Sequence, residues 1–230
     1  MVSVYRWQQG LVGVLLALVG LFQGCGTGEY ENRLQQRVAT MGQETAFADF
    51  GTPVPLPDST LTVSMPKEFQ PAPANADPKR LKIPFAELPE WKATYEGGIE
   101  DSAKGKQHYY CYLAVAAGDN DPGAALHGRV NAAMAGTPAP ADAQVPTPSG
   151  KQETWRRFRA TGKQAFWYTE ANGTGRLAEM DGLLEVWSRK VPEGNCWVLI
   201  AWRVPTVNGK DFVNLDQKGP LMAGSVTVKK

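Results

Sequence analysis

The chain has 230 residues, of which 43% are hydrophobic and 10% aromatic, and this is enough for one domain with a sizeable core. Its 24 basic and 23 acidic residues nearly cancel, and they form no basic block. Because nucleic-acid binders neutralise several phosphates with clustered Lys and Arg, this balance argues against a nucleic-acid partner.

The N-terminus has the pattern of an export signal. Arg6 is the only charged residue before residue 11, and the twelve residues of 11–22 contain no charged or polar side chain. As a helix this segment would span about 18 Å at roughly 1.5 Å per residue, whereas a membrane-spanning helix must cross roughly 30 Å of hydrocarbon. The pattern therefore favours a cleaved signal peptide over a transmembrane anchor.

The segment LFQGC, which ends at Cys25, resembles the lipobox of bacterial lipoproteins. The resemblance implies cleavage between Gly24 and Cys25, so that residues 1–24 are removed and Cys25 carries acyl chains such as palmitate. Gly26 stands where an Asp would indicate retention at the inner membrane, so the resemblance leans towards the outer membrane. Gln23 departs from the family, which more often has Ala or Ser there. An uncleaved N-terminal helix or an ordinary secretory signal is the alternative.

Residues 25–59 are predicted to form a lipidated tether. Apolar residues at helical spacing predict a short amphipathic helix within 29–50. These residues are Leu34, Val38 and Met41. The three prolines of 51–59 predict an extended linker. A single globular domain is then expected over 60–230.

The domain is expected to open with a short strand at 61–65, followed by a nearly continuous apolar strand at 108–117 that suits the centre of a sheet. The main helix is predicted over about 122–135. Its signals are the N-cap Asp121, the first-turn Pro122, the apolar Leu126, Val130 and Met134, and the terminating Gly136. Residues 137–150 contain four prolines and are expected to form an exposed loop.

The last third of the chain predicts five strands, at 153–160, 164–171, 182–190, 195–204 and 222–228. The turn signals between them are Thr161-Gly162, Asn172-Gly173, Glu193-Gly194 and Asn208-Gly209. Consecutive strands with short turns form antiparallel hairpins, so the predicted fold class is α+β, a central antiparallel sheet with one main flanking helix. This order of strand, long loop, strand, helix and hairpins resembles the PsbP-like fold, which implies the same sheet with flanking helices.

Cys111 and Cys196 are the cysteines left once Cys25 is assigned to the lipid, and both fall in predicted strands. The cell envelope permits disulfides, so a bridge between the two is one interpretation. The alternative is a pair of buried free thiols that act as small hydrophobic side chains.

The candidates for chemistry are few. His108 is either a general base or a histidine at the edge of a sheet, and His127 is expected to be a helix residue. No recognisable catalytic motif and no set of metal ligands is present in the sequence. We therefore predict no catalytic residues, no metal and no cofactor.

Aromatic and basic residues of the last strands allow two interpretations. Trp187, Trp197 and Trp202 lie among Leu, Val and Ile, which favours a role in the core over a stacking platform for a sugar or peptide. The arginines of the TWRRFR segment are expected to form a solvated charged face. They are Arg156, Arg157 and Arg159.

Together these features predict a lipid-anchored cell-envelope lipoprotein that faces the periplasm or the exterior, with a non-catalytic structural or partner-binding domain. The alternatives are a module that binds a small ligand, glycan or peptide through exposed aromatic side chains, and an envelope hydrolase. The expected partners are membrane lipid, through acylation of Cys25, and an envelope protein or glycan.

Overall fold

The computed structural model describes residues 27–56, 58–74, 76, 80, 91, 93–101 and 105–229. The predicted signal peptide and Cys25, the predicted lipidation site, lie outside these residues. The chain divides into two compact units at Ala46 and Phe47, and each is described by itself. Among the helices that the structure describes, none is long and apolar enough to span a membrane.

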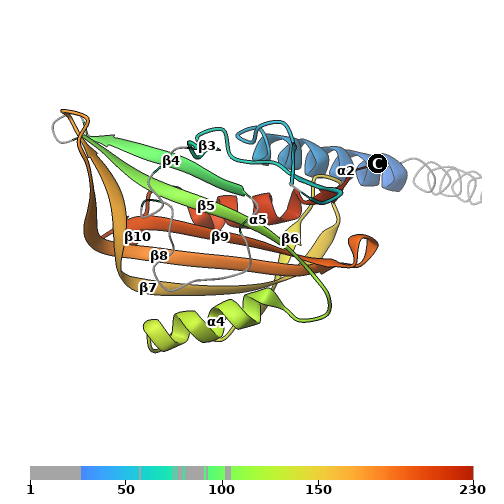
Figure 1. Cartoon of the computed structure of the whole chain (residues 1–230). Coiled ribbons are helices and arrows are strands. Elements are labelled where there is room, and N and C mark those ends of the chain that lie inside the picture. Colours follow the sequence, from blue (N-terminus) through green and yellow to red (C-terminus); the bar gives the residue numbers. More distant parts are fainter. Residues whose placement is uncertain are drawn as a thin grey trace, which may run out of the picture. The chain divides into compact units, whose positions relative to one another are not determined.

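The N-terminal unit contains helix α2 (Thr27–Ala46), which confirms the helix predicted within 29–50 (Figure 1). Its large apolar side chains are exposed and recur at helical spacing. They are Tyr30, Leu34, Val38 and Met41. An exposed ion pair between Arg33 and Glu29, one turn apart, adds little to the stability of the helix.

The second unit is built on an eight-stranded antiparallel sheet, which confirms the α+β fold class. The strand order is β10-β9-β8-β7-β5-β4-β3, and β6 pairs with the free edge of β7. The strands are β3 (Gln70–Pro71), β4 (Ala93–Asp101), β5 (Gly105–Ala117), β6 (Ala141–Pro146), β7 (Gln152–Glu170), β8 (Gly175–Val191), β9 (Cys196–Val207) and β10 (Lys210–Asp211). A three-stranded sheet joins β1 (Val54–Pro55), β2 (Leu61–Val63) and β11 (Thr227–Val228).

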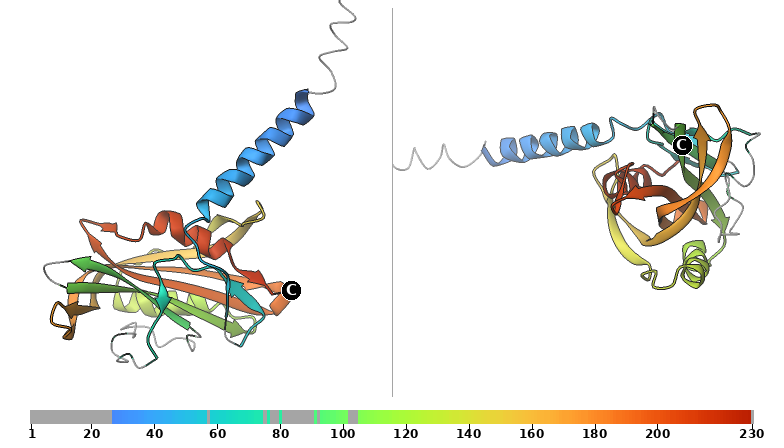
Figure 2. Two further views of the ribbon diagram at one scale, coloured as in Figure 1. Left: turned by 90° about the horizontal axis from the view of Figure 1, so that it is seen from above. Right: turned by 90° about the vertical axis from the view of Figure 1, so that its left-hand side faces the viewer.

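Strand β5 makes the large sheet curl. Its residues Tyr110–Ala117 pair with β9, whereas Gly105–Gln107 pair with the end of β7. The long β7–β8 hairpin therefore curves across to β5, as Figure 2 shows. The predicted turn at Thr161-Gly162 is wrong, because β7 continues through it and Gly162 pairs with Gly182 of β8.

Helix α4 (Pro122–Ala133) covers one face of this sheet. Asp121 is its N-cap and accepts a hydrogen bond from the backbone N–H of Gly123 at 2.8 Å, as the sequence predicts. Leu126 and Val130 are fully buried in the core that the helix forms with the sheet. The sheet residues of this core include Tyr110, Tyr112, Phe158, Leu184, Val186 and Leu199.

Helix α5 (Leu215–Gly224) packs on the opposite face and was not predicted. The strand expected at 222–228 is wrong except for β11 (Thr227–Val228), because Met222, Ala223 and Gly224 form the buried end of α5. The carboxylate of Asp211 accepts hydrogen bonds from the backbone N–H groups of Val213 and Leu215, both at 3.0 Å, and so fixes the start of α5.

One prediction about a loop is corrected and two about turns are confirmed. The exposed loop expected at 137–150 contains β6, whose pairing with β7 satisfies backbone groups despite the surrounding prolines. The turn at Asn208-Gly209 is confirmed, since both residues have positive φ, of 53° and 74°, as a two-residue hairpin of this type requires. The turn at Asn172-Gly173 is also confirmed, with Gly173 at φ 85°.

The two cysteines in the domain are free and buried, so the structure agrees with the alternative of two buried thiols and not with the disulfide. Cys111 lies opposite Trp202, whereas Cys196 lies opposite Ala117, six positions further along β5. At roughly 3.3 Å per residue this separates the two cysteines by about 20 Å, far beyond the roughly 7 Å that a disulfide allows between Cα atoms. The sequence showed two cysteines in strands but not the register between those strands.

Candidate functional site

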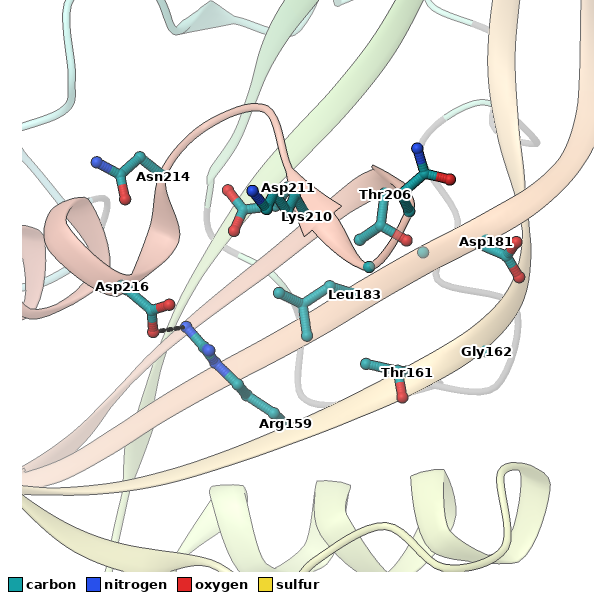
Figure 3. A pocket seen from close by; sticks show the side chains of 13 residues that line it. Arg159, Thr161, Gly162, Asp181, Leu183, Thr206, Lys210, Asp211, Asn214 and Asp216 are labelled. Carbon is teal, nitrogen blue, oxygen red and sulfur yellow. Dashed lines mark ion pairs between the residues drawn. The ribbon is translucent and has the colours of Figure 1, made fainter.

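A cavity of about 760 Å³ opens between β7, β8, the β9–β10 hairpin and the start of α5 (Figure 3). The register explains its walls: Thr161 of β7 pairs with Leu183 of β8, and both face the side of the sheet that α5 covers. Thr206 and Asp211 are a cross-strand pair of the hairpin and close the opposite wall. The pocket therefore depends on segments that lie up to 57 residues apart, from Arg159 to Asp216.

A buried carboxylate orients the arginines beside this pocket. Glu185 of β8 is 0% exposed and accepts hydrogen bonds from Arg157 at 2.8 Å, from Arg159, and from the indole N–H of Trp187 at 2.6 Å. The guanidinium of Arg157 also lies over the Trp187 ring, 5.0 Å from its centroid. A carboxylate with three donors can stay charged in the interior, and it holds both arginines in fixed positions.

A second, exposed carboxylate forms ion pairs with the same arginines from the solvent side. Asp216, in the first turn of α5, lies 2.8 Å from Arg159 and 3.3 Å from Arg157, and its side chain is 74% exposed. Partial burial would raise the pKa of Asp216, but hydrogen bonds and attraction from Arg159 and Arg157 outweigh this and lower it. The solvated charged face predicted for Arg157 and Arg159 is thus corrected: their side chains are only 26% and 30% exposed.

The other charged groups of the pocket differ in how they are engaged. Asp181 pairs with Lys163 at 3.0 Å, and Asp211 is committed to the backbone of α5. The backbone of Lys210 pairs with Val207, and its exposed ammonium group makes no ion pair or hydrogen bond with the part of the chain that the structure describes.

Apolar side chains stand beside this lysine. Val207 pairs with Lys210 across the β9–β10 hairpin, and Phe212 follows two positions after Lys210. Both Val207 and Phe212 are 53% exposed. Large apolar side chains at an exposed hairpin next to a pocket are a feature of interaction surfaces.

A second cluster surrounds His108, the histidine considered as a general base. His108 lies in β5 and is almost fully buried. Its Nδ1 contacts the carboxylate of Glu96, and its Nε2 lies 2.9 Å from the hydroxyl of Thr169. Arg80 also binds Glu96 and places its guanidinium over Trp167, 5.9 Å from the ring centroid.

The charge state of this cluster follows from its partners. Burial would raise the pKa of Glu96, but hydrogen bonds and attraction from His108 and Arg80 outweigh it and lower the pKa. The order carboxylate, imidazole, hydroxyl is the order found in acyl-transfer sites, yet Glu96 is shared with Arg80 as in a structural ion pair. His127 is a half-buried residue of α4, as expected, with its ring edge-on to Phe158 at 5.2 Å.

Among the described residues, sequence reasoning missed two fully buried charges, Glu185 and Arg203. Arg203 of β9 donates to the hydroxyl of Tyr112 at 3.2 Å and to a backbone carbonyl, and lies 4.9 Å from the Phe166 ring centroid. A signal for both was present, because each is a single charge inside an apolar run, LLEVW and IAWRV. A charge that interrupts a buried strand needs a buried partner.

Comparison with known proteins gives one distant structural likeness. No protein family matches the chain, and no curated protein matches its sequence. The crystal structure of the Saccharomyces cerevisiae Ran-binding protein Mog1p is similar to it with a TM-score of 0.40 and 14% sequence identity. The match covers 78% of this chain and 95% of that one. The likeness is one of fold.

The positions of the described side chains were also compared with the requirements of a metal site. Within the described ranges, no group of three or more His, Cys, Asp or Glu side chains converges as a metal site requires. The pocket offers guanidinium, ammonium, hydroxyl and amide groups together with the carboxylates of Asp181, Asp211 and Asp216. A mixed lining of this kind suits a polar ligand.

Proposed function

We propose that this protein is a bacterial envelope lipoprotein, anchored through acylated Cys25, whose globular unit is a non-catalytic partner-binding domain. The signal-like residues 1–24 and the LFQGC segment support the anchor. The observation that carries the binding role is the open pocket beside the β9–β10 hairpin, with Val207 and Phe212 exposed next to it. Arg159, Asp181 and Asp216 of its lining are held by ion pairs and Asp211 by backbone N–H groups, which suits recognition by a preorganised surface.

The anchor is tested with Cys25→Ser. The variant should stay unprocessed and should take up no labelled palmitate, because the thioether to the lipid needs the thiol of Cys25. Cys196→Ser is the matched control and should label like the parent. Incorporation of label into the Cys25→Ser variant would show that the anchor is wrong.

The binding surface is tested by site-specific photo-crosslinking in the intact envelope. A photoreactive residue at Phe212 of the full chain should give one discrete adduct, and the adduct should be lost when Lys210→Glu is added. The matched control site is Leu177, an exposed apolar residue at the β7–β8 hairpin, which should give no such adduct. If no adduct forms at Phe212, or if its yield is unchanged by Lys210→Glu, this surface is not the binding surface.

The arrangement of Glu96, His108 and Thr169 favours one alternative, an envelope hydrolase. In that case Thr169 would attack an ester, His108 would take the hydroxyl proton and Glu96 would orient the imidazole. The full chain would then hydrolyse p-nitrophenyl acetate, and His108→Asn would slow it by roughly 100-fold or more. We expect no hydrolysis above the buffer rate, because Arg80 holds Glu96 in a structural ion pair. Hydrolysis that is lost in variants of both His108 and Thr169 would favour the hydrolase over the binding domain.

A further inference from the structure

We propose that helix α2 lies along the surface of the lipid bilayer, with one apolar stripe in contact with the lipid and the opposite face of the helix in water. The stripe consists of Tyr30, Leu34, Val38 and Met41. This inference rests on the proposed anchor at Cys25 and adds a second, non-covalent contact between the chain and the membrane.

The stripe is a continuous apolar face on an otherwise polar helix. At roughly 100° per residue its four side chains fall within about 80° of the helix circumference. They are between 50% and 67% exposed, whereas the exposed Asn32 lies on the opposite face. A helix that is apolar on one face only lies in the plane of a bilayer surface and does not cross the bilayer.

The position of α2 in the chain indicates what this face contacts. Thr27, the first residue of the helix, follows the predicted lipidation site by two residues, and two residues of chain span at most about 7 Å. Acyl chains on Cys25 therefore hold the first turn of α2 at the lipid headgroups. Tyr30 is the stripe residue nearest to the anchor, and tyrosine, with an apolar ring and a polar tip, is enriched at this depth of a membrane.

The anchor also makes a stripe of this size sufficient. Four partly exposed side chains bury little apolar surface, so the helix alone binds a bilayer weakly. A lipid anchor beside the helix turns the second contact into an intramolecular one, at a high effective concentration of membrane. The weak stripe is then enough to keep α2 on the surface.

Charge neither drives this contact nor prevents it. Helix α2 carries two basic and three acidic residues, a net charge of −1. Arg33 is already paired with Glu29, and Arg37 lies one turn beyond it at the edge of the stripe. An arginine at such an edge can extend its guanidinium to the headgroups while its stem stays on the apolar surface. The contact should therefore be similar on neutral and anionic lipid.

A second copy of the chain fits this face less well than a bilayer does. A coiled coil uses apolar residues at alternating spacings of three and four over at least three heptads. The stripe from Tyr30 to Met41 has spacings of four, four and three and covers less than two heptads. A bilayer surface requires no such register.

The test places a photoreactive diazirine side chain in α2 of the full chain in bacterial cells. At Val38, illumination should give a phospholipid adduct several-fold more often than at Asn32 on the opposite face. Mass spectrometry of the purified chain identifies the adduct. The lipidated chain in phosphatidylcholine vesicles, with or without phosphatidylglycerol, should give similar yields at Val38, and an adduct that requires phosphatidylglycerol would overturn the apolar contact.

A variant tests the stripe itself. Leu34→Glu should reduce the phospholipid adduct at Val38 several-fold, because it places a charge in the middle of the stripe while Glu remains a good helix former. Asn32→Glu is the matched control, since it adds the same charge on the opposite face, and it should leave the yield unchanged. Equal yields for the two variants would overturn the inference. Circular dichroism verifies that both keep the helix.

The outcomes distinguish this inference from the proposed function. If Cys25 takes up palmitate but Val38 and Asn32 give equal phospholipid adducts or none, the anchor stands and the inference is wrong. If Val38 instead crosslinks to a second copy, to another protein or within its own chain, the inference is also wrong. If the phospholipid adduct at Val38 persists in the Cys25→Ser variant, α2 lies on the bilayer and the proposed anchor is not what holds it there.

Discussion

Trp187 donates its indole N–H to the carboxylate of Glu185, two residues away on β8, and both side chains are fully buried. Their cross-strand neighbours on β7 are Arg157 and Arg159, so the four side chains form one block under α5. Gly219 of α5 lies directly on this block, where a Cβ would overlap the Glu185 carboxylate. The helix can approach the buried charge this closely because the residue there has no side chain.

Loss of the buried carboxylate should destabilise the protein strongly. Glu185→Gln removes the charge that balances Arg157 and Arg159, and breaking a buried ion pair in this way typically costs about 3 to 5 kcal/mol of unfolding free energy. Urea denaturation measures this loss. Glu179→Gln, an exposed change on the same strand, should stay within about 0.5 kcal/mol of the parent. Similar losses for the two variants would contradict the role assigned to Glu185.

Stability should decrease in acid through Glu96. The pKa of Glu96 is lower in the folded state than its unfolded value of about 4.3, so its contribution is complete above that pH and is lost as the pH falls through the folded-state pKa. Glu96→Gln should cost about 1 to 3 kcal/mol at neutral pH and reduce the slope of stability against pH in this acid range. Urea midpoints from pH 3 to 7 measure both effects, and an unchanged slope would exclude Glu96 as a contributor.

The thiols of Cys111 and Cys196 should be free and differ in reactivity. Burial raises the pKa of both thiols, and that of Cys111 well above its usual range, so little thiolate forms at neutral pH. In the folded protein Cys111 should resist iodoacetamide, and both cysteines should be alkylated in urea without reductant. Peptide mass spectrometry decides the point, since a linked Cys111 and Cys196 pair would contradict the register of β5 and β9.

Two tryptophans of the same strand should differ in their effect on stability. Trp202 is fully buried with its ring edge-on to Phe69 at 5.1 Å, whereas Trp197 is only half-buried. Trp202→Ala should lower the free energy of unfolding by about 3 to 5 kcal/mol, and Trp197→Ala by clearly less. Equal losses in urea denaturation would show that the two rings are packed alike, as the sequence alone predicted.

Local signals in the sequence were sufficient for several elements. Asp121 and Pro122 mark the start of α4 through chemistry confined to one turn, and Asn208-Gly209 marks a hairpin through its own backbone preference. The failures lie where distant contacts overrule local preference. Gly162 has the composition of a turn, but pairing with Gly182 keeps it within a long strand.

The sequence by itself determined the α+β class and the main helix, because the type of each helix or strand depends largely on the pattern of residues within its own segment. Only the tertiary structure decided the rest: that Cys111 and Cys196 lie too far apart to bond, that Glu185 is buried between two arginines, and that Lys210 and Asp216 meet at one pocket. The physical reason is register. The pairing between strands that no short turn connects, such as β5 and β9, sets which side chains become neighbours, and the pattern of one strand does not identify its partner.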